Sequence, residues 1–213
     1  MKRIRKLWVI YFFIVIFLFV CGYLIALKVG NRQLGNSDSV DVNQPIQAFL
    51  IKSDVIKKNC NLYKINPRVY ISTIYGELSN NFNAFDKYDL IRAKWGFDPS
   101  IGFGQMKIST GKWLEDNFAG SFGIGRSTNR EELIEKLSSD NININYSIFY
   151  VKLIINKYHQ KYFDDPSVKT IATYYSRGID VPNRNIDKNY FNYIGVTADS
   201  FYYSNLILNE FPR

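Results

Sequence analysis

A glutamate and a glycine-rich loop are the parts of this 213-residue chain that suggest chemistry. Glu77 lies near the end of a stretch that is otherwise mainly apolar or aromatic, VYISTIYGELS. A carboxyl group with large apolar neighbours is expected to be partly desolvated, which favours its neutral form and suits a general acid. A surface glutamate at a frayed helix end is the alternative interpretation, and spacing alone does not choose between the two.

The loop at 98–110 reads DPSIGFGQMKIST and lacks the order that a phosphate-binding loop needs. A Walker loop requires G-x-x-x-x-G-K-[ST] after a strand, and a dinucleotide loop requires a third glycine in a βαβ frame. We interpret the loop as the wall of a cleft, where Gly102 and Gly104 let a polymer approach closely. Gln105 would offer amide hydrogen bonds, and Ser109 would cap the next helix.

Other mechanisms lack the residues that they need. His159 is the only histidine, so a Ser-His-Asp triad or a multi-histidine zinc site would have to be built around one residue. His159 is expected to be exposed at a polar helix end. Cys60 lies on an apolar helical stripe, where a small buried side chain is a better interpretation than a reactive thiol.

The N-terminal residues predict a membrane anchor. Residues 7–27 carry no charge and, at about 1.5 Å of rise per residue, would span about 31 Å as a helix, the thickness of a bilayer's hydrocarbon core. Four cations precede them within residues 1–6, so the positive-inside rule places this tail in the cytoplasm. A cleaved signal peptide is the alternative, although the run is long and no small-x-small cleavage site follows it.

This orientation predicts a single-pass protein of the cell membrane whose C-terminal domain lies outside the cytoplasm, on the periplasm or wall side. The net charge is +8, and four of these charges belong to the tail. The remainder is mildly basic and would attract polyanions such as a bacterial wall, whereas nucleic acid is not an expected partner on that side of a membrane.

Residues 28–45 are polar and predict a flexible linker, and residues 46–213 predict a single, mainly α domain. No run alternates as a strand would, although YFNYIGV could hide a short hairpin. The helical signals are an apolar stripe from Ile46 towards Tyr63, a start at Asn66-Pro67, a capping box at Thr128–Glu131, a broad apolar surface over 143–158, and candidate helices at 167–176 and 197–210.

Five short motifs occur in an order that resembles a known family. They are NLYKINPRVYISTIYGELS at 61–79, SIGFGQM at 100–106, NINYSIFYV at 143–151, TYYSRG at 173–178 and DSFYYSNLI at 199–207. Together they resemble the lytic transglycosylases with the soluble-lytic-transglycosylase, or goose-type-lysozyme-like, domain. Each motif alone is weak, and the resemblance rests on their order behind an export signal.

The resemblance implies a lysozyme-like domain in which Glu77 is the single catalytic acid. It implies that Ser100, Gln105 and Met106 line the cleft, and that Tyr175 and Tyr150 orient the glutamate or the sugar. For Tyr150, which lies on an apolar face, a packing role is the stronger interpretation. The chain departs from the family pattern in four respects. Leu78 separates Glu77 from Ser79, where the family has serine directly after the glutamate, so that serine's role is not carried over. Ser147 replaces a glycine, Ser176 replaces an asparagine, and the segment 85–98 lengthens the interval between Glu77 and Gln105.

The implied activity is cleavage of the β-1,4 bond between N-acetylmuramic acid and N-acetylglucosamine in peptidoglycan, with a 1,6-anhydro product and no metal or cofactor. One alternative is a muramidase of the same fold, with Asp86, Asp89 or Asp98 as the second carboxylate. Another is a wall-binding subunit of a secretion or conjugation machine in which catalysis has decayed.

Overall fold

The computed structural model describes residues 14–17, 20, 43–81, 86–121, 125–179 and 190–212, and the chain divides into two units, Met1–Asp41 and Val42–Arg213. In the first unit, residues 14–17 are helical and their apolar side chains are exposed. The predicted tail at 1–6, most of the predicted anchor at 7–27 and most of the linker lie outside the described residues. Within the described ranges, no helix is long and apolar enough to cross a membrane.

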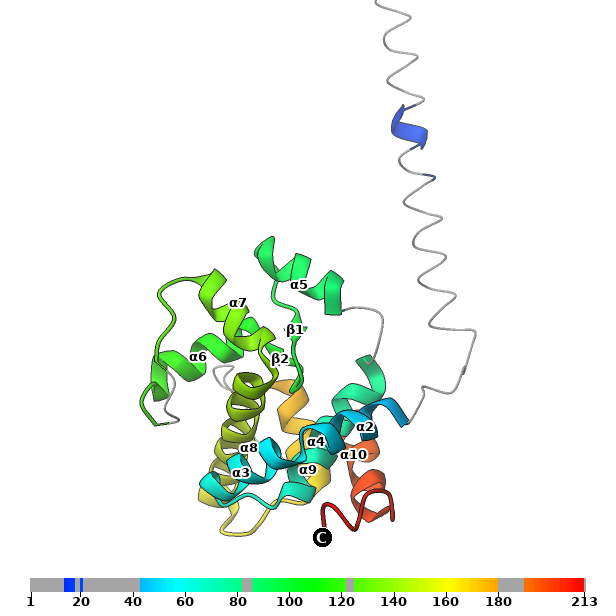
Figure 1. Ribbon diagram of the computed structural model, residues 1–213, viewed down its shortest axis with the longest axis vertical. Coiled ribbons are helices and arrows are strands. Elements are labelled where there is room, and N and C mark those ends of the chain that lie inside the picture. Colours follow the sequence, from blue (N-terminus) through cyan, green and yellow to red (C-terminus); the bar gives the residue numbers. More distant parts are fainter. Residues whose placement is uncertain are drawn as a thin grey trace, which may run out of the picture. The chain divides into compact units, whose positions relative to one another are not determined.

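The second unit is mainly α, as the sequence predicted (Figure 1). Its strands form one antiparallel hairpin in which Ser100 pairs with Lys107 and Ile101 with Met106. The elements are α2 (Asn43–Ile51), α3 (Ser53–Tyr63), α4 (Pro67–Asn81), α5 (Asp86–Lys94), β1 (Ser100–Ile101), β2 (Met106–Lys107), α6 (Ile108–Phe118), α7 (Arg130–Ser138), α8 (Asp140–Tyr162), α9 (Val168–Arg177) and α10 (Tyr193–Tyr203).

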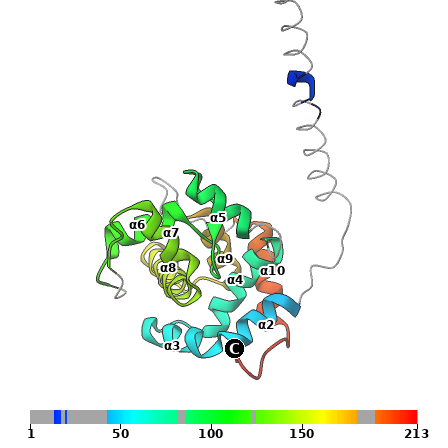
Figure 2. The same ribbon diagram turned by 45° about the horizontal axis from the view of Figure 1, so that its top comes forward.

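Helix α4, which carries Glu77, packs closely against α9 and α10 (Figures 1 and 2). Two glycines allow the close packing of these three helices, Gly76 between α4 and α10 and Gly195 between α10 and α9. A Cβ added to Gly76 would lie 2.7 Å from the carbonyl oxygen of Ile194 on α10, and one added to Gly195 would lie 2.5 Å from the carbonyl oxygen of Lys169 on α9. The helices approach backbone to backbone, so α4 is buried over most of its length.

Arg68 is the largest polar side chain buried in this packing, and it is fully excluded from solvent. Its guanidinium group donates hydrogen bonds to carbonyl oxygens at the end of α10 and beyond: 2.9 Å to Phe201, 2.8 Å to Ser204 and 2.5 Å to Leu206. A helix leaves its last carbonyl groups without partners in the helix itself. Arg68 therefore closes the C-terminus of α10 and fixes that helix to α4.

Several predicted boundaries are wrong for local reasons. Helix α2 begins at Asn43, inside the predicted linker, because Pro45 is tolerated in a first turn and is buried with Ile46. The C-terminal helix begins at Tyr193 and ends at Tyr203, not at 197–210, because Asn192 caps it by accepting from the Gly195 N–H. The YFNYIGV segment thus enters a helix, and the hairpin lies in the glycine-rich loop.

Two predicted caps are also displaced by neighbouring residues. Asn129, not Thr128, caps α7, and Glu132 reaches back to the Thr128 N–H at 2.7 Å. Ser109 lies inside α6, and Asp98 caps that helix by accepting from the Ser109 N–H at 2.8 Å. The predictions of a helix start at Asn66-Pro67 and of a buried Cys60 are confirmed.

We expect Arg68→Met to destabilise the second unit by about 3 kcal/mol, because the carbonyl groups at the end of α10 would lose charged donors while they remain buried. Urea denaturation followed by circular dichroism measures the change. Arg92→Met, on the exposed side of α5, is the matched control and should alter stability by less than about 0.5 kcal/mol. A similar small effect for both variants would contradict the role assigned to Arg68.

Candidate active site

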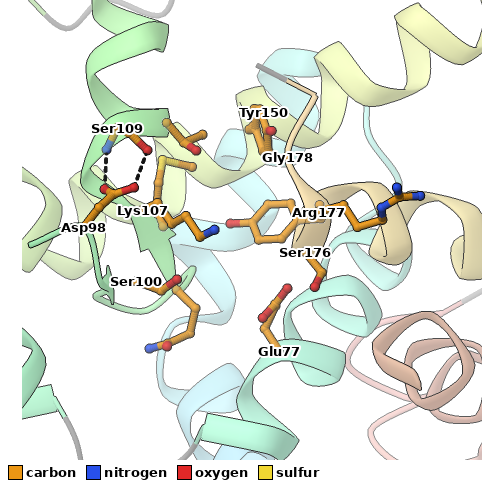
Figure 3. A pocket seen from close by; sticks show the side chains of 13 residues that line it. Glu77, Asp98, Ser100, Lys107, Ser109, Tyr150, Ser176, Arg177 and Gly178 are labelled. Carbon is orange, nitrogen blue, oxygen red and sulfur yellow. Dashed lines mark hydrogen bonds between the residues drawn. The ribbon is translucent and has the colours of Figure 1, made fainter. Parts of the chain in front are cut away.

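One pocket of about 170 Å³ brings together all the site residues chosen from the sequence (Figure 3). They come from α4, the β-hairpin, α8 and α9, so segments far apart in the chain meet here. Glu77 and Gln105 are 28 positions apart in the sequence and line the same pocket. The chosen residues are Glu77, Ser100, Gln105, Met106, Tyr150 and Tyr175, and the pocket is completed by Asp98, Lys107, Ser109, Thr110, Ser176, Arg177 and Gly178. Their function stays a prediction, but their convergence is a fact of the fold.

Glu77 is a buried carboxyl group, with only 7% of its surface exposed, so it is not a surface residue at a frayed helix end. Burial raises its pKa to about 7, against smaller lowering effects from the Ser176 hydroxyl, which donates a hydrogen bond, and from the charge of Lys107. Figure 3 shows Glu77 and Ser176 side by side, with the Lys107 ammonium directed into the same space. A carboxyl group in this state can both give and accept a proton near neutral pH.

Glu115 is a second buried carboxyl group, and its pKa is shifted in the opposite direction to that of Glu77. It is also buried, at 3% exposed, but it accepts hydrogen bonds from Tyr146 at 2.5 Å and from the N–H of Ser127 at 2.6 Å. Although burial alone would raise its pKa, these bonds and Lys136 together hold the pKa below its usual value. Glu115 is thus a fixed anion that joins α6 to α8, whereas Glu77 faces a cavity.

Gln105 occupies a strained position in the turn between β1 and β2. Its φ of 48° lies in the left-handed region, where residues other than glycine and asparagine are uncommon. Its Nε2 donates to the Gly102 carbonyl oxygen at 3.1 Å, and within the described part of the chain its Oε1 has no hydrogen-bond partner. Strain of this kind concentrates at functional sites, and here it presents an amide oxygen at the pocket.

The turn is held in place by Asn143 of α8. Its Nδ2 donates to the carbonyl oxygens of Ile101 at 3.0 Å and Leu137 at 2.7 Å, and its Oδ1 accepts from the Gly104 N–H at 2.6 Å. One side chain therefore forms hydrogen bonds with three backbone groups and fixes the position of the loop against α8.

The predicted role of the two loop glycines is wrong. A Cβ on Gly102 would lie 2.2 Å from the Leu137 carbonyl oxygen, and one on Gly104 would lie 2.5 Å from the Ser147 Cβ. Both glycines are needed because the loop lies against the end of α7 and the start of α8, and neither is among the residues that line the pocket. The close approach is made by helices of the same domain, not by a ligand.

The two tyrosines position backbone at the pocket. The Tyr175 hydroxyl donates to the Gly104 carbonyl oxygen at 2.5 Å, which ties α9 to the turn, and burial raises its pKa well above the usual value. The Tyr150 hydroxyl accepts from the Ile179 N–H at 2.6 Å, and its ring packs edge-on against Tyr175. The packing role favoured for Tyr150 agrees with these contacts.

Lys107, Ser176 and Arg177 line the pocket but were not selected from the sequence. Lys107 follows Met106, and Ser176 and Arg177 follow Tyr175. Their position next to predicted site residues is the one signal in the sequence that points to them. Arg177 is held at the rim by the ring of Tyr190, 4.2 Å from its guanidinium carbon. Of these two cations, Lys107 is the one whose charge acts on the Glu77 carboxyl group.

Of the aspartates considered as a second carboxylate whose side chains are described, Asp98 lines the pocket and Asp89 does not. Both oxygens of Asp98 accept from Ser109, at 2.8 Å from the backbone N–H and 2.6 Å from the hydroxyl. Asp89 pairs with Arg92 on α5, away from the pocket lining, and the Asp86 side chain lies outside the description.

Among the residues placed by the structure, no group of three or more His, Cys, Asp or Glu side chains is arranged to hold a metal ion. Burial raises the pKa of the Cys60 thiol to about 12, so it is not a thiolate at neutral pH. Compared with known proteins, the chain matches no protein-family model and shows no significant similarity to a curated protein sequence. The site must therefore be argued from its own geometry.

The raised pKa of Glu77 predicts that this site costs stability at neutral pH. The pKa of Glu77 is about 7 in the folded state, against 4.5 in the unfolded state. Below pH 4.5 the carboxyl group is protonated in both states and folding carries no penalty. The free energy of unfolding falls as the pH rises from 4.5 through 7, because the folded state then holds a proton that the unfolded state has lost. The free energy of unfolding falls by about 3 kcal/mol in all, since each unit of pKa shift corresponds to about 1.36 kcal/mol. We expect Glu77→Gln to match the wild type at pH 4 and to exceed it by about that amount at pH 8, in urea denaturation.

Glu115→Gln is the matched control, because the pKa of Glu115 is lowered in the fold. Its removal should destabilise the domain at pH 8, the opposite sign to Glu77→Gln. If Glu77→Gln were also destabilising at pH 8, the Glu77 carboxyl group would be a structural anion.

Proposed function

We propose that the chain is a membrane-anchored peptidoglycan lytic transglycosylase with a lysozyme-like domain and one catalytic carboxyl group, Glu77. The proposal rests chiefly on the pocket. Its lining includes a buried carboxyl group with a pKa of about 7, together with residues from several of the sequence motifs. Support for the anchor comes from the uncharged run at 7–27, of which the described residues 14–17 are helical with exposed apolar side chains. The protein would be held in the cell membrane with this domain outside the cytoplasm.

The chemistry needs one group that acts first as an acid and then as a base. Glu77 protonates the glycosidic oxygen as its bond to C1 of the muramic acid residue breaks. The acetamido oxygen of that sugar stabilises the cation developing at C1. The Glu77 carboxylate then takes the proton of the 6-hydroxyl group, whose oxygen bonds to C1 and closes the 1,6-anhydro ring. The acid is regenerated, and no water is consumed.

The surrounding residues support each half of this cycle. Between the two proton transfers Glu77 is an anion in a buried site, where the nearby positive charge of Lys107 and the Ser176 hydroxyl would stabilise it. The free Oε1 of Gln105 offers an acceptor to an amide N–H or a sugar hydroxyl. Ser100 supplies a further hydroxyl on the same wall, and Met106 an apolar surface.

A muramidase of the same fold is the second candidate, and the position of Asp98 in the pocket is the observation that favours it. A hydrolase would use this carboxylate to activate water or to trap the sugar. We favour the lytic reaction because both oxygens of Asp98 are already hydrogen-bonded to Ser109 at the start of α6.

Digestion of purified peptidoglycan by residues 42–213, followed by mass spectrometry, tests the proposal. This part of the chain forms one compact unit with its own core. We expect anhydro-muropeptides from the wild type and a loss of at least about 100-fold in rate for Glu77→Gln, the scale of removing a general acid. Asp98→Asn should keep the anhydro product. Reducing-end products would indicate a muramidase, and binding without cleavage by both proteins would indicate a wall-binding subunit of a larger machine.

Lys107→Met should move the alkaline limb of the rate profile to higher pH. The positive charge of Lys107 lowers the pKa of Glu77, whereas burial raises it. Without that charge the pKa rises further, so Glu77 stays protonated to a higher pH. The profile of kcat/KM against pH measures this limb. Lys112→Met, on the outer side of α6 where it pairs with Asp116, should leave the limb in place. An unchanged limb in both variants would show that Lys107 does not act on Glu77.

A further inference from the structure

Helix α5 and the turn after it carry an apolar face that points to solvent. Tyr88, Ile91 and Trp95 recur at helical spacing and are 68%, 45% and 75% exposed, and Phe97 follows at 55%. The opposite side of the helix is the buried one, with Ala93 fully covered and Leu90 packed on the core. The segment thus has two apolar faces, and among the described residues of the domain only the inner face has a partner.

The outward face is held in place by the fold. The Arg130 guanidinium donates to the Ala93 carbonyl oxygen at 3.2 Å and to the Phe97 carbonyl oxygen, so α7 fixes the end of α5 and the turn. A large apolar surface that is held rigidly towards solvent commonly marks a docking site.

The composition of the outward face of α5 indicates which kind of surface it would bind. Tyrosine and tryptophan beside isoleucine and phenylalanine, bordered by exposed Lys87, Arg92 and Lys94, is the combination that favours the interface of a bilayer. A sugar platform would need carboxylate or amide groups beside the rings to bind hydroxyl groups. The described carboxylates there are already paired: Asp89 with Arg92 at 3.2 Å, and Asp98 with Ser109 at 2.8 and 2.6 Å.

The length of chain between the predicted anchor and the domain allows this contact. Residues 28–42 reach at most about 50 Å when extended, which exceeds the diameter of a domain of this size, about 40 Å. A tether of that length would let any face of the domain meet the bilayer, so the choice of face must come from the surface itself.

We propose that the outward face of α5, formed by Tyr88, Ile91, Trp95 and Phe97 with its bordering cations, docks on the anionic surface of the membrane in which the chain is anchored. The proposal rests on the membrane anchoring proposed above. Asp98 and Ser100 lie within three positions after Phe97 and line the pocket, so docking holds that edge of the cleft at the bilayer. The domain then meets glycan strands close to the membrane surface.

Residues 42–213 with phosphatidylcholine vesicles, with and without a quarter of phosphatidylglycerol, provide the test. This fragment contains Trp95 and Trp113, and Trp113 packs against Phe118 inside the domain. We expect co-sedimentation with the anionic vesicles, weaker binding to neutral ones, and quenching of Trp95 by brominated lipids. Trp95→Phe should still bind and lose the quenching.

The double variant Ile91→Ser, Trp95→Ser should weaken vesicle binding about tenfold or more, since it removes the two central side chains from the contact. Leu62→Ser is the matched control: it removes a side chain that is 67% exposed on α3, which lies far from α5 in both views (Figures 1 and 2). Unchanged circular dichroism establishes that each variant is folded. Glu77→Gln should bind vesicles as the wild type does, so failure of the catalytic proposal would not affect this result.

Absence of vesicle binding, or equal loss in the double variant and in Leu62→Ser, would overturn the proposal. It would also be overturned if the double variant bound vesicles normally and instead lost affinity for isolated peptidoglycan, because α5 would then be an extension of the glycan site.

Discussion

The burial of α4 is the constraint on which the rest of the domain depends. A helix covered on most sides must satisfy every polar side chain that it carries, because a buried group without a partner costs about 1–3 kcal/mol. Arg68 meets this requirement at the end of α10, and Ser72 and Thr73 bond back to carbonyl groups of their own helix. Among the described polar side chains of α4, Glu77 is the one that lines the pocket, where the Ser176 hydroxyl and the charge of Lys107 only partly oppose burial, and its raised pKa follows from that environment.

The opposite wall of the pocket is organised by a different buried group. Asn143 fixes the turn after β1 through three hydrogen bonds, and the Tyr175 hydroxyl fixes the same turn from α9. Gln105 is forced into the left-handed region between these two supports. The pocket is therefore rigid on both sides, and rigid placement of an acid and an amide is what a site of this kind needs to hold a sugar at a defined angle.

Local chemistry explains how much of this could be predicted. The mainly α fold, the helix start at Asn66-Pro67 and the burial of Cys60 depend on periodicity and capping near each residue, which the sequence displays. The cap of α6 by Asp98 and the partners of Gly102 depend on groups far along the chain, and no local pattern reveals them. Among site residues, Glu77 stood out because its neighbours are apolar, whereas Lys107 and Ser176 are ordinary residues until the fold brings them to it.

The departures from the motifs are accommodated by contacts within the domain. Ser147, where the motif has glycine, forms a 2.7 Å hydrogen bond with Tyr70, and its Cβ fits only because Gly104 has none. Ser176, where the motif has asparagine, places its hydroxyl on Glu77. A larger amide at 176 would need more of the space that the pocket now leaves open beside the acid. Ser147 therefore fits α8 against the glycine-rich turn, and Ser176 bonds to the glutamate without removing its burial, which is the property that the proposed chemistry requires.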